Sequence, residues 1–120
     1  MGGIPMRIER VLLLMLLIFA FSFTLVSAKN HTPEERGKAH FDNPAFAGGQ
    51  KSCSTCHPNG RGLGEAGAKT AFSIMGGQQN SLEETVNACI VNANKGNAIN
   101  NESVEMQELV SYINSLGTQK

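Results

Sequence analysis

Three residues near the middle of the chain, Cys53, Cys56 and His57, follow the pattern Cys-x-x-Cys-His. This pattern is typical of the attachment site for a c-type haem, where each thiol adds to a vinyl group and the histidine ligates the iron from the proximal side. The two intervening residues bring both sulfurs to the vinyl-bearing edge of the ring and place the histidine beneath the iron. We therefore expect one covalently attached haem c, held by Cys53, Cys56 and His57.

Two other chemistries use the same cysteine spacing. A thioredoxin-like redox pair belongs in a βαβ setting, and no strand-like apolar runs flank this motif. A zinc site needs two further ligands at comparable spacing, but Cys89, His31 and His40 are scattered along the chain. The haem interpretation agrees best with the other features of the chain.

The N-terminal segment predicts export. Arg7 and Arg10 precede an apolar stretch over residues 11–26, and small residues follow at positions 27 and 28. These features indicate a signal peptide over residues 1–28, cleaved after Ala28, and a single small domain over residues 29–120. The expected location is the periplasm or another extracytoplasmic space. The alternative is a retained membrane anchor, because the stretch approaches the roughly 18 residues that span a bilayer.

Composition narrows the possible partners and suggests how the domain is stabilised. The chain has 10 basic and 10 acidic residues and a formal net charge of zero. No basic patch indicates a nucleic-acid partner. A domain of this size buries a modest core and commonly needs a crosslink or a metal. A haem bonded through two sulfurs would provide that crosslink.

A first helix is predicted before the haem motif. Thr32 can cap its N-terminus and Glu35 completes a capping box, so the helix should run to about His40 or Phe41. Gly37 within it costs about 1 kcal/mol relative to alanine, which predicts close approach of another helix. Residues 42–50 are expected to form a loop.

A second helix should begin at Ser81, where Glu84 suggests another capping box, and end near residue 94. Its apolar residues recur at spacings of three and four, which places Cys89 on the inward face. Between His57 and this helix we expect irregular, glycine-rich chain. Its glycines either let the backbone approach the flat ring or form a flexible surface loop.

A third helix is predicted from Ser103 to Leu116, closed by Gly117. Its buried stripe consists of Met106, Leu109, Val110, Ile113 and Leu116. We expect the first helix to cross this one at Gly37, near Tyr112. No strand alternation of useful length appears, so the predicted fold class is all-α, with three or more helices around one haem.

The distal iron ligand has several candidates. Met75 lies in the glycine-rich stretch, and Met106 lies on the apolar stripe of the last helix, where core filling is the alternative role. Cys89 is a third cysteine beyond the two of the motif, and an odd cysteine in an exported protein requires an explanation. It could also be a small buried hydrophobe. His31 and His40 are minor candidates.

In the order of these elements, the chain resembles a class I cytochrome c. The matching features are Gly37 and Phe41 ahead of the haem motif, the glycines after His57, and a last helix with Leu109, Tyr112, Ile113 and Leu116. The resemblance implies a small fold around one haem with crossed terminal helices. The chain lacks the Met-Pro that such proteins often place before the last helix.

A second resemblance is local. Residues 82–90, followed by Gly96 and residues 103–106, are similar to the haem domains of periplasmic sulfur-oxidation cytochromes and thiosulfate dehydrogenases. In those domains a cysteine of the matching helix ligates the iron. The resemblance implies that Cys89 is the distal ligand, with Met106 and Met75 as alternatives.

Three functions follow from these observations. The first is one-electron transfer between redox partner proteins, which requires no catalytic residues. The second is a His/Cys-ligated haem subunit of a sulfur-compound oxidoreductase, or a cytochrome that binds nitric oxide or carbon monoxide. An oxidoreductase subunit would require a hetero-oligomeric partner. The third is an exported domain without haem.

Overall fold

The computed structural model describes residue 2 and residues 30–119. The chain divides into two units, Met1–Asn30 and His31–Lys120. Apart from residue 2, the predicted signal peptide and its cleavage site lie outside the described residues. Within the described part of the chain, we find no helix with the length and apolar character needed to cross a bilayer.

Helix α2 spans Pro33–Asp42 and begins as its sequence predicts. The Thr32 side chain accepts a hydrogen bond from the Glu35 N–H at 3.2 Å, and the Glu35 carboxylate accepts one from the Thr32 N–H at 3.0 Å. These two bonds satisfy N–H groups that a helix N-terminus leaves without partners. The predicted capping box is confirmed, and the helix ends one residue beyond Phe41.

Helix α3 spans Leu82–Asn92, and Ser81 caps it by accepting from the Glu84 N–H at 3.1 Å. The Glu84 carboxylate accepts from the Asn80 N–H at 2.8 Å. The predicted capping box is therefore only half formed. The Glu84 carboxylate accepts from the N–H of Asn80, the residue before the cap, and the predicted bond from the Ser81 N–H is wrong.

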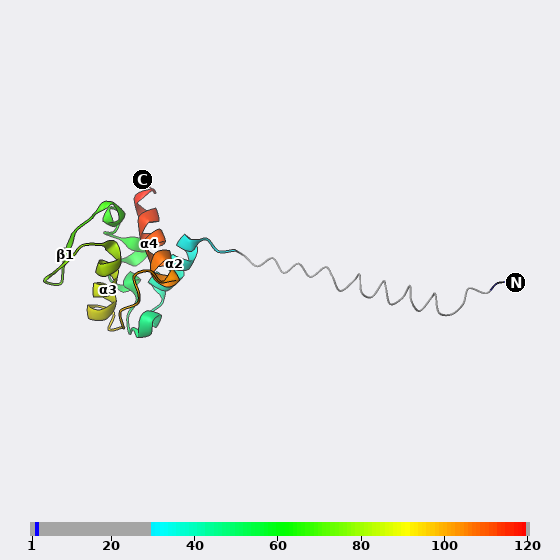
Figure 1. Cartoon of the computed structure of the whole chain (residues 1–120), viewed down its shortest axis with the longest axis horizontal. Coiled ribbons are helices and arrows are strands. Elements are labelled where there is room, and N and C mark those ends of the chain that lie inside the picture. The colour runs from blue at the N-terminus through cyan, green and yellow to red at the C-terminus, as the bar shows by residue number, and fades with distance from the viewer. Residues whose placement is uncertain (1, 3–29, 120) are drawn as a thin grey trace. The chain divides into compact units, whose positions relative to one another are not determined.

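Helix α4 spans Val104–Gly117 and is capped by Ser103, which accepts from the Met106 N–H at 3.2 Å. The predicted end at Leu116 is one residue short, since Gly117 belongs to the helix. Figure 1 shows α4 beside α2, with α3 and the strand β1 on the other side of the domain.

A short hairpin stands where the sequence predicted irregular chain. Strands β1 (Phe72–Ile74) and β2 (Gly77–Gln79) pair antiparallel, with Phe72 opposite Gln79 and Ile74 opposite Gly77. The two-residue turn between them has φ values of 50° at Met75 and 76° at Gly76. Such left-handed turns match the twist of hairpin strands. The described residues otherwise form helices and single 3₁₀ turns, which confirms the all-α class.

The contact between α2 and α4 depends on a glycine. A Cβ at Gly37 would lie 1.9 Å from the Glu108 carbonyl oxygen and 2.9 Å from the Tyr112 Cβ. No side chain fits in this space, so the backbones approach closely only because residue 37 is glycine. The predicted crossing at Gly37 and Tyr112 is confirmed.

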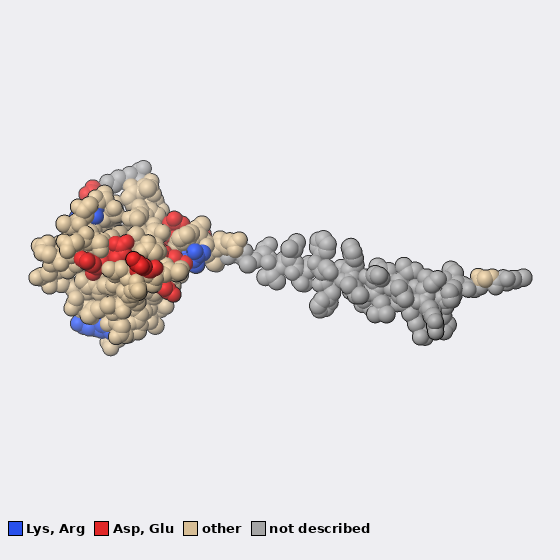
Figure 2. Space-filling view, viewed as in Figure 1, with Lys and Arg blue, Asp and Glu red and all other residues tan. Residues whose placement is uncertain are grey.

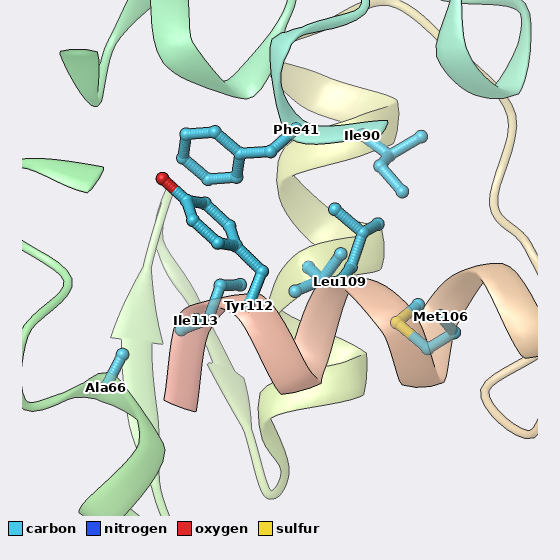
Figure 3. Packing of buried hydrophobic residues seen from close by; sticks show 8 residues of the cluster. Phe41, Ala66, Ile90, Met106, Leu109, Tyr112 and Ile113 are labelled. Atoms are coloured by element: carbon cyan, nitrogen blue, oxygen red, sulfur yellow. The ribbon is translucent and has the colours of Figure 1, made fainter. Parts of the chain in front are cut away.

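The apolar core lies at this crossing (Figure 3). The rings of Phe41 and Tyr112 meet edge to face, with centroids 5.1 Å apart. Leu109 from α4 and Ile90 from α3 are fully buried. These contacts join the three helices in one core, as their apolar stripes predict.

A polar cluster lies beside the same crossing. Glu108 is buried on α4, and its carboxylate accepts hydrogen bonds from Arg36 Nε and from His40 Nε2, the latter at 2.9 Å. The Arg36 hydrogen bond holds the pKa of Glu108 below its ordinary value of 4.5, although burial acts in the opposite direction. The cluster therefore adds a second, electrostatic link between α2 and α4.

Candidate cofactor site

An apolar cavity of about 510 Å³ lies among the helices, the Cys-x-x-Cys-His segment and strand β1. Its volume is within the range of about 300–1,000 Å³ that is usual for cofactor and small-molecule pockets. Apolar side chains from α2, α3, α4 and β1 form most of its walls, and Glu65 and Lys69 are its charged lining residues. A cavity of this size and apolar character suits a large, mostly apolar ligand.

Three potential ligand or attachment residues line this one cavity: Cys53, His57 and Cys89. The first two come from the motif segment, and the third comes from α3. The fold therefore brings together residues that are more than thirty positions apart in the sequence. An imidazole and a thiol facing one apolar space match the donors that hold haem iron in several protein classes.

His57 is oriented by its own loop. Its Nδ1 lies 2.9 Å from the Arg61 carbonyl oxygen. Because a carbonyl can only accept, Nδ1 is the donor, and Nε2 then carries a lone pair that can ligate a metal. Histidines that ligate metals usually have such an outer partner, so the geometry at His57 fits an axial ligand.

The two motif cysteines differ in their surroundings. Cys53 is half-buried and lines the cavity, whereas Cys56 is exposed. The turn is held by the Cys53 carbonyl oxygen, which accepts from the Cys56 N–H at 3.2 Å and from the His57 N–H at 3.0 Å. Burial raises the pKa of the Cys53 thiol, and a hydrogen bond from Asn94 acts in the opposite direction. All three cysteines are free thiols in the structure.

Cys89 lies on the face of α3 that the sequence predicted. Its side chain is half-buried and lines the cavity. Burial raises the pKa of its thiol, and the nearby Cys53 and Cys56 raise it further. The free thiol is therefore kept protonated, and a bound metal would have to displace that proton.

The other candidate ligands lie elsewhere. Met75 is 59% exposed at the hairpin turn, and Met106 is fully buried in the core, and neither lines the cavity. His31 is exposed beside Glu35, and His40 contacts Glu108. Within residues 30–119, no group of three or more His, Cys, Asp and Glu side chains is placed to hold a metal ion.

The glycines after His57 have two roles. Gly62 and Gly64 line the cavity, so no side chain intrudes there. Gly60 instead packs under α4, where a Cβ would lie 2.4 Å from the Leu116 Cδ1. Gly62 and Gly64 therefore leave space in the cavity wall, whereas Gly60 allows close packing against the last helix.

Sequence reasoning missed the contribution of the hairpin. Phe72 and Ile74 project into the cavity from β1, and Thr85 joins Cys89 on the wall formed by α3. The alternation of Phe72 and Ile74 around Ser73 is the signal that could have indicated a half-buried strand.

Comparison with protein families gives one match. The model of the SoxA/TsdA cytochrome c domain matches residues 36–119. This range contains the haem motif, Cys89, helices α3 and α4, and the part of α2 that follows Glu35. Searches of curated proteins and of solved structures give no match.

Proposed function

We propose that this chain, which belongs to the family of SoxA/TsdA cytochrome c domains, carries single electrons between redox partner proteins. A cytochrome c domain implies haem c binding, and the proposal assigns one haem to the chain. Cys53 and Cys56 would attach it covalently, His57 would be the proximal ligand and Cys89 the distal ligand. The observation that carries the proposal is that His57 and Cys89 line one apolar cavity together with Cys53.

When bound, the haem supplies the Fe(III)/Fe(II) couple, and the protein sets its potential. The bond from His57 Nδ1 to the Arg61 carbonyl oxygen fixes the tautomer that presents Nε2 as a ligand. Cys89 would act as a thiolate, whose negative charge favours the ferric state and lowers the reduction potential relative to a thioether ligand. The apolar walls would limit the contact of these groups with water.

Export is part of the proposal. Residues 1–28 would act as a signal peptide cleaved after Ala28, and residues 29–120 would function in the periplasm or another extracytoplasmic space. The basic and apolar pattern of the first 28 residues supports this assignment. The mass of the secreted protein would identify its first residue.

A second candidate function is a haem subunit of a sulfur-compound oxidoreductase. The matched family, together with a cysteine in the cavity, favours it. Such a subunit would need a hetero-oligomeric partner to pass its electrons on. A related candidate is nitric oxide or carbon monoxide binding at a distal position from which Cys89 can dissociate.

A redox titration of the purified, haem-loaded protein tests the proposed function. We expect one haem per chain, a reversible one-electron transition, and a higher midpoint potential in Cys89→Met, because a thioether stabilises Fe(III) less than a thiolate does. The absence of a reversible transition would contradict electron transfer. Thiosulfate oxidation by the isolated protein, or carbon monoxide uptake by its reduced form, would favour the second candidate or its gas-binding relative.

A further inference from the structure

A second hollow adjoins the apolar cavity. It is more open, has a volume of about 520 Å³, and lies at the C-terminal end of α4, where Asn114 and Thr118 line it. None of its lining residues has a large apolar side chain. Gly64, Glu65 and Lys69 line both this hollow and the cavity. One short stretch of chain therefore forms the boundary between an apolar space and an open one with polar side chains.

Charge is unevenly placed around the cavity. Its charged lining residues, Glu65 and Lys69, are both exposed and are only four positions apart. Among the described residues that line the cavity, Lys69 is the only lysine or arginine. The other walls consist mainly of apolar side chains such as Phe72, Val86 and Leu109, which offer no partner to a negative charge. An anionic group in this cavity would therefore find a cation only at residues 64–69.

The expected cofactor has its charge on one edge. The haem ring is large and apolar, and its two propionate carboxylates project from the edge opposite the two vinyl groups. Burying an ionised carboxylate against apolar side chains is costly, whereas an ammonium group beside it donates a strong, charge-assisted hydrogen bond. The end of the cavity at residues 64–69 is thus the end that suits the carboxylates.

The neighbouring elements agree with this orientation. The 3₁₀ turn Cys53–Thr55, which contains the first motif cysteine, packs against α2. The 3₁₀ turn Ala66–Ala68, which lies between Glu65 and Lys69, packs against α4. The two turns contact different helices, which is consistent with their holding opposite edges of one ring.

We propose that Lys69 pairs with a haem propionate, and that the residues shared by the two hollows form the edge where the carboxylates lie. The proposal rests on the proposed function, since it requires a haem in the cavity. Glu65 adds a negative charge at the same edge. Lys69 is therefore the lining residue that offsets the negative charge there, and it acts on the iron through the propionate as a positioning residue.

Two substitutions at Lys69 separate its charge from its size. Lys69→Gln removes the charge and keeps a long polar side chain, whereas Lys69→Arg keeps the charge. The matched control is Lys95→Gln, because Lys95 is exposed, lines neither hollow and donates to the Asn92 carbonyl oxygen at 2.7 Å. Each variant is produced from the full-length chain with an intact haem-attachment system.

Resonance Raman spectroscopy of the haem-loaded protein gives the readout. The frequency of the propionate bending mode rises when the carboxylate accepts hydrogen bonds, so it should fall in Lys69→Gln. Lys69→Arg should restore the wild-type frequency, and Lys95→Gln should leave it unchanged. The midpoint potential should also fall in Lys69→Gln, because the loss of a nearby positive charge favours Fe(III).

Two results would overturn the proposal. One is a propionate mode that is the same in Lys69→Gln and the wild type. The other is a shifted mode in Lys69→Gln that Lys69→Arg does not restore, since this would mean that the charge of Lys69 is not what the propionate contacts. A wild-type protein that contains no haem, or has no reversible redox transition, would instead contradict the proposed function, so the two failures are distinguishable.

Discussion

Glu108 is the buried residue whose ionisation matters most for the helix crossing. Its carboxylate contacts two side chains of α2, Arg36 and His40, and only 6% of the residue is exposed. The Arg36 hydrogen bond lowers the pKa of Glu108 against the opposing effect of burial. A carboxyl group with a lowered pKa stabilises the fold above its unfolded-state pKa and loses this contribution as pH falls through its folded-state pKa.

The substitution Glu108→Gln should therefore reduce the free energy of unfolding at neutral pH. It should also make this free energy depend less strongly on pH in the acidic range. We expect a loss of about 1–2 kcal/mol in the free energy of unfolding at neutral pH, a modest value because Arg36 is half-exposed and its charge is screened. The difference from wild type should shrink below pH 4.5, the ordinary pKa of the group. Urea unfolding at several pH values measures this, with the exposed Glu105→Gln as control. Identical acid dependence in wild type and Glu108→Gln would contradict the assignment.

The sequence did not reveal this cluster because its members are far apart. Glu108 is 72 positions from Arg36 and 68 from His40. Arg36 and His40 are four residues apart and so share a face of α2, but sequence alone does not say what covers that face. A glutamate beside the apolar stripe of α4 was the available signal. The position of Cys89 on the inward face of α3 was predictable, in contrast, because the apolar residues of that helix recur at a regular helical spacing.

At the scale of elements, the close contact between α2 and α4 makes a specific prediction for Gly37→Ala. Helix propensity alone would make this change stabilising by about 1 kcal/mol. A Cβ at this position would overlap the Glu108 carbonyl, 1.9 Å away, so we expect a net destabilisation of about 2 kcal/mol or more.

Urea unfolding of Gly37→Ala checks this prediction. The control is Ala39→Gly, an exposed position of the same helix, which should lose about 1 kcal/mol through propensity alone. A Gly37→Ala protein as stable as the wild type would show that the two helices can separate without cost.

The helices were predictable because their ends carry local signals. Thr32 and Ser81 each cap a helix through a side-chain oxygen, as their sequence positions indicated. Ser103, predicted as the first residue of the last helix, is instead its N-cap. The hairpin was not predicted, because its strands are three residues long and its turn places Met75 at positive φ. Methionine gives no turn signal of the kind that Asn-Gly provides.

At the scale of the molecule, the formal net charge of the chain is zero. On the face seen in Figure 2, several acidic side chains lie over α3 and α4. The first turns of these helices carry Glu83, Glu84 and Glu105, where negative charge interacts favourably with the helix dipole. Local helix stabilisation therefore accounts for part of this distribution.

The small domain should depend on its cofactor for stability. Without haem, an apolar cavity of about 510 Å³ would be left among three helices. We expect the Cys53→Ser/Cys56→Ser double variant to melt at least about 10 °C below the haem-loaded protein, since each kcal/mol corresponds to roughly 4–8 °C in a domain of this size. Thermal circular dichroism measures the difference, with Thr55→Ser as a control that keeps the motif. Equal melting temperatures would mean that the cofactor does not stabilise the fold.

Electron paramagnetic resonance of the oxidised, haem-loaded protein, beside its Cys89→Ser variant, tests whether His57 and Cys89 ligate the same iron. We expect a low-spin signal typical of thiolate ligation in the wild type and its loss in Cys89→Ser. Met75→Leu and Met106→Leu should keep the signal, because neither methionine lines the cavity. A wild-type spectrum typical of histidine and methionine ligation, unchanged in Cys89→Ser, would contradict the pairing of His57 and Cys89 across this cavity.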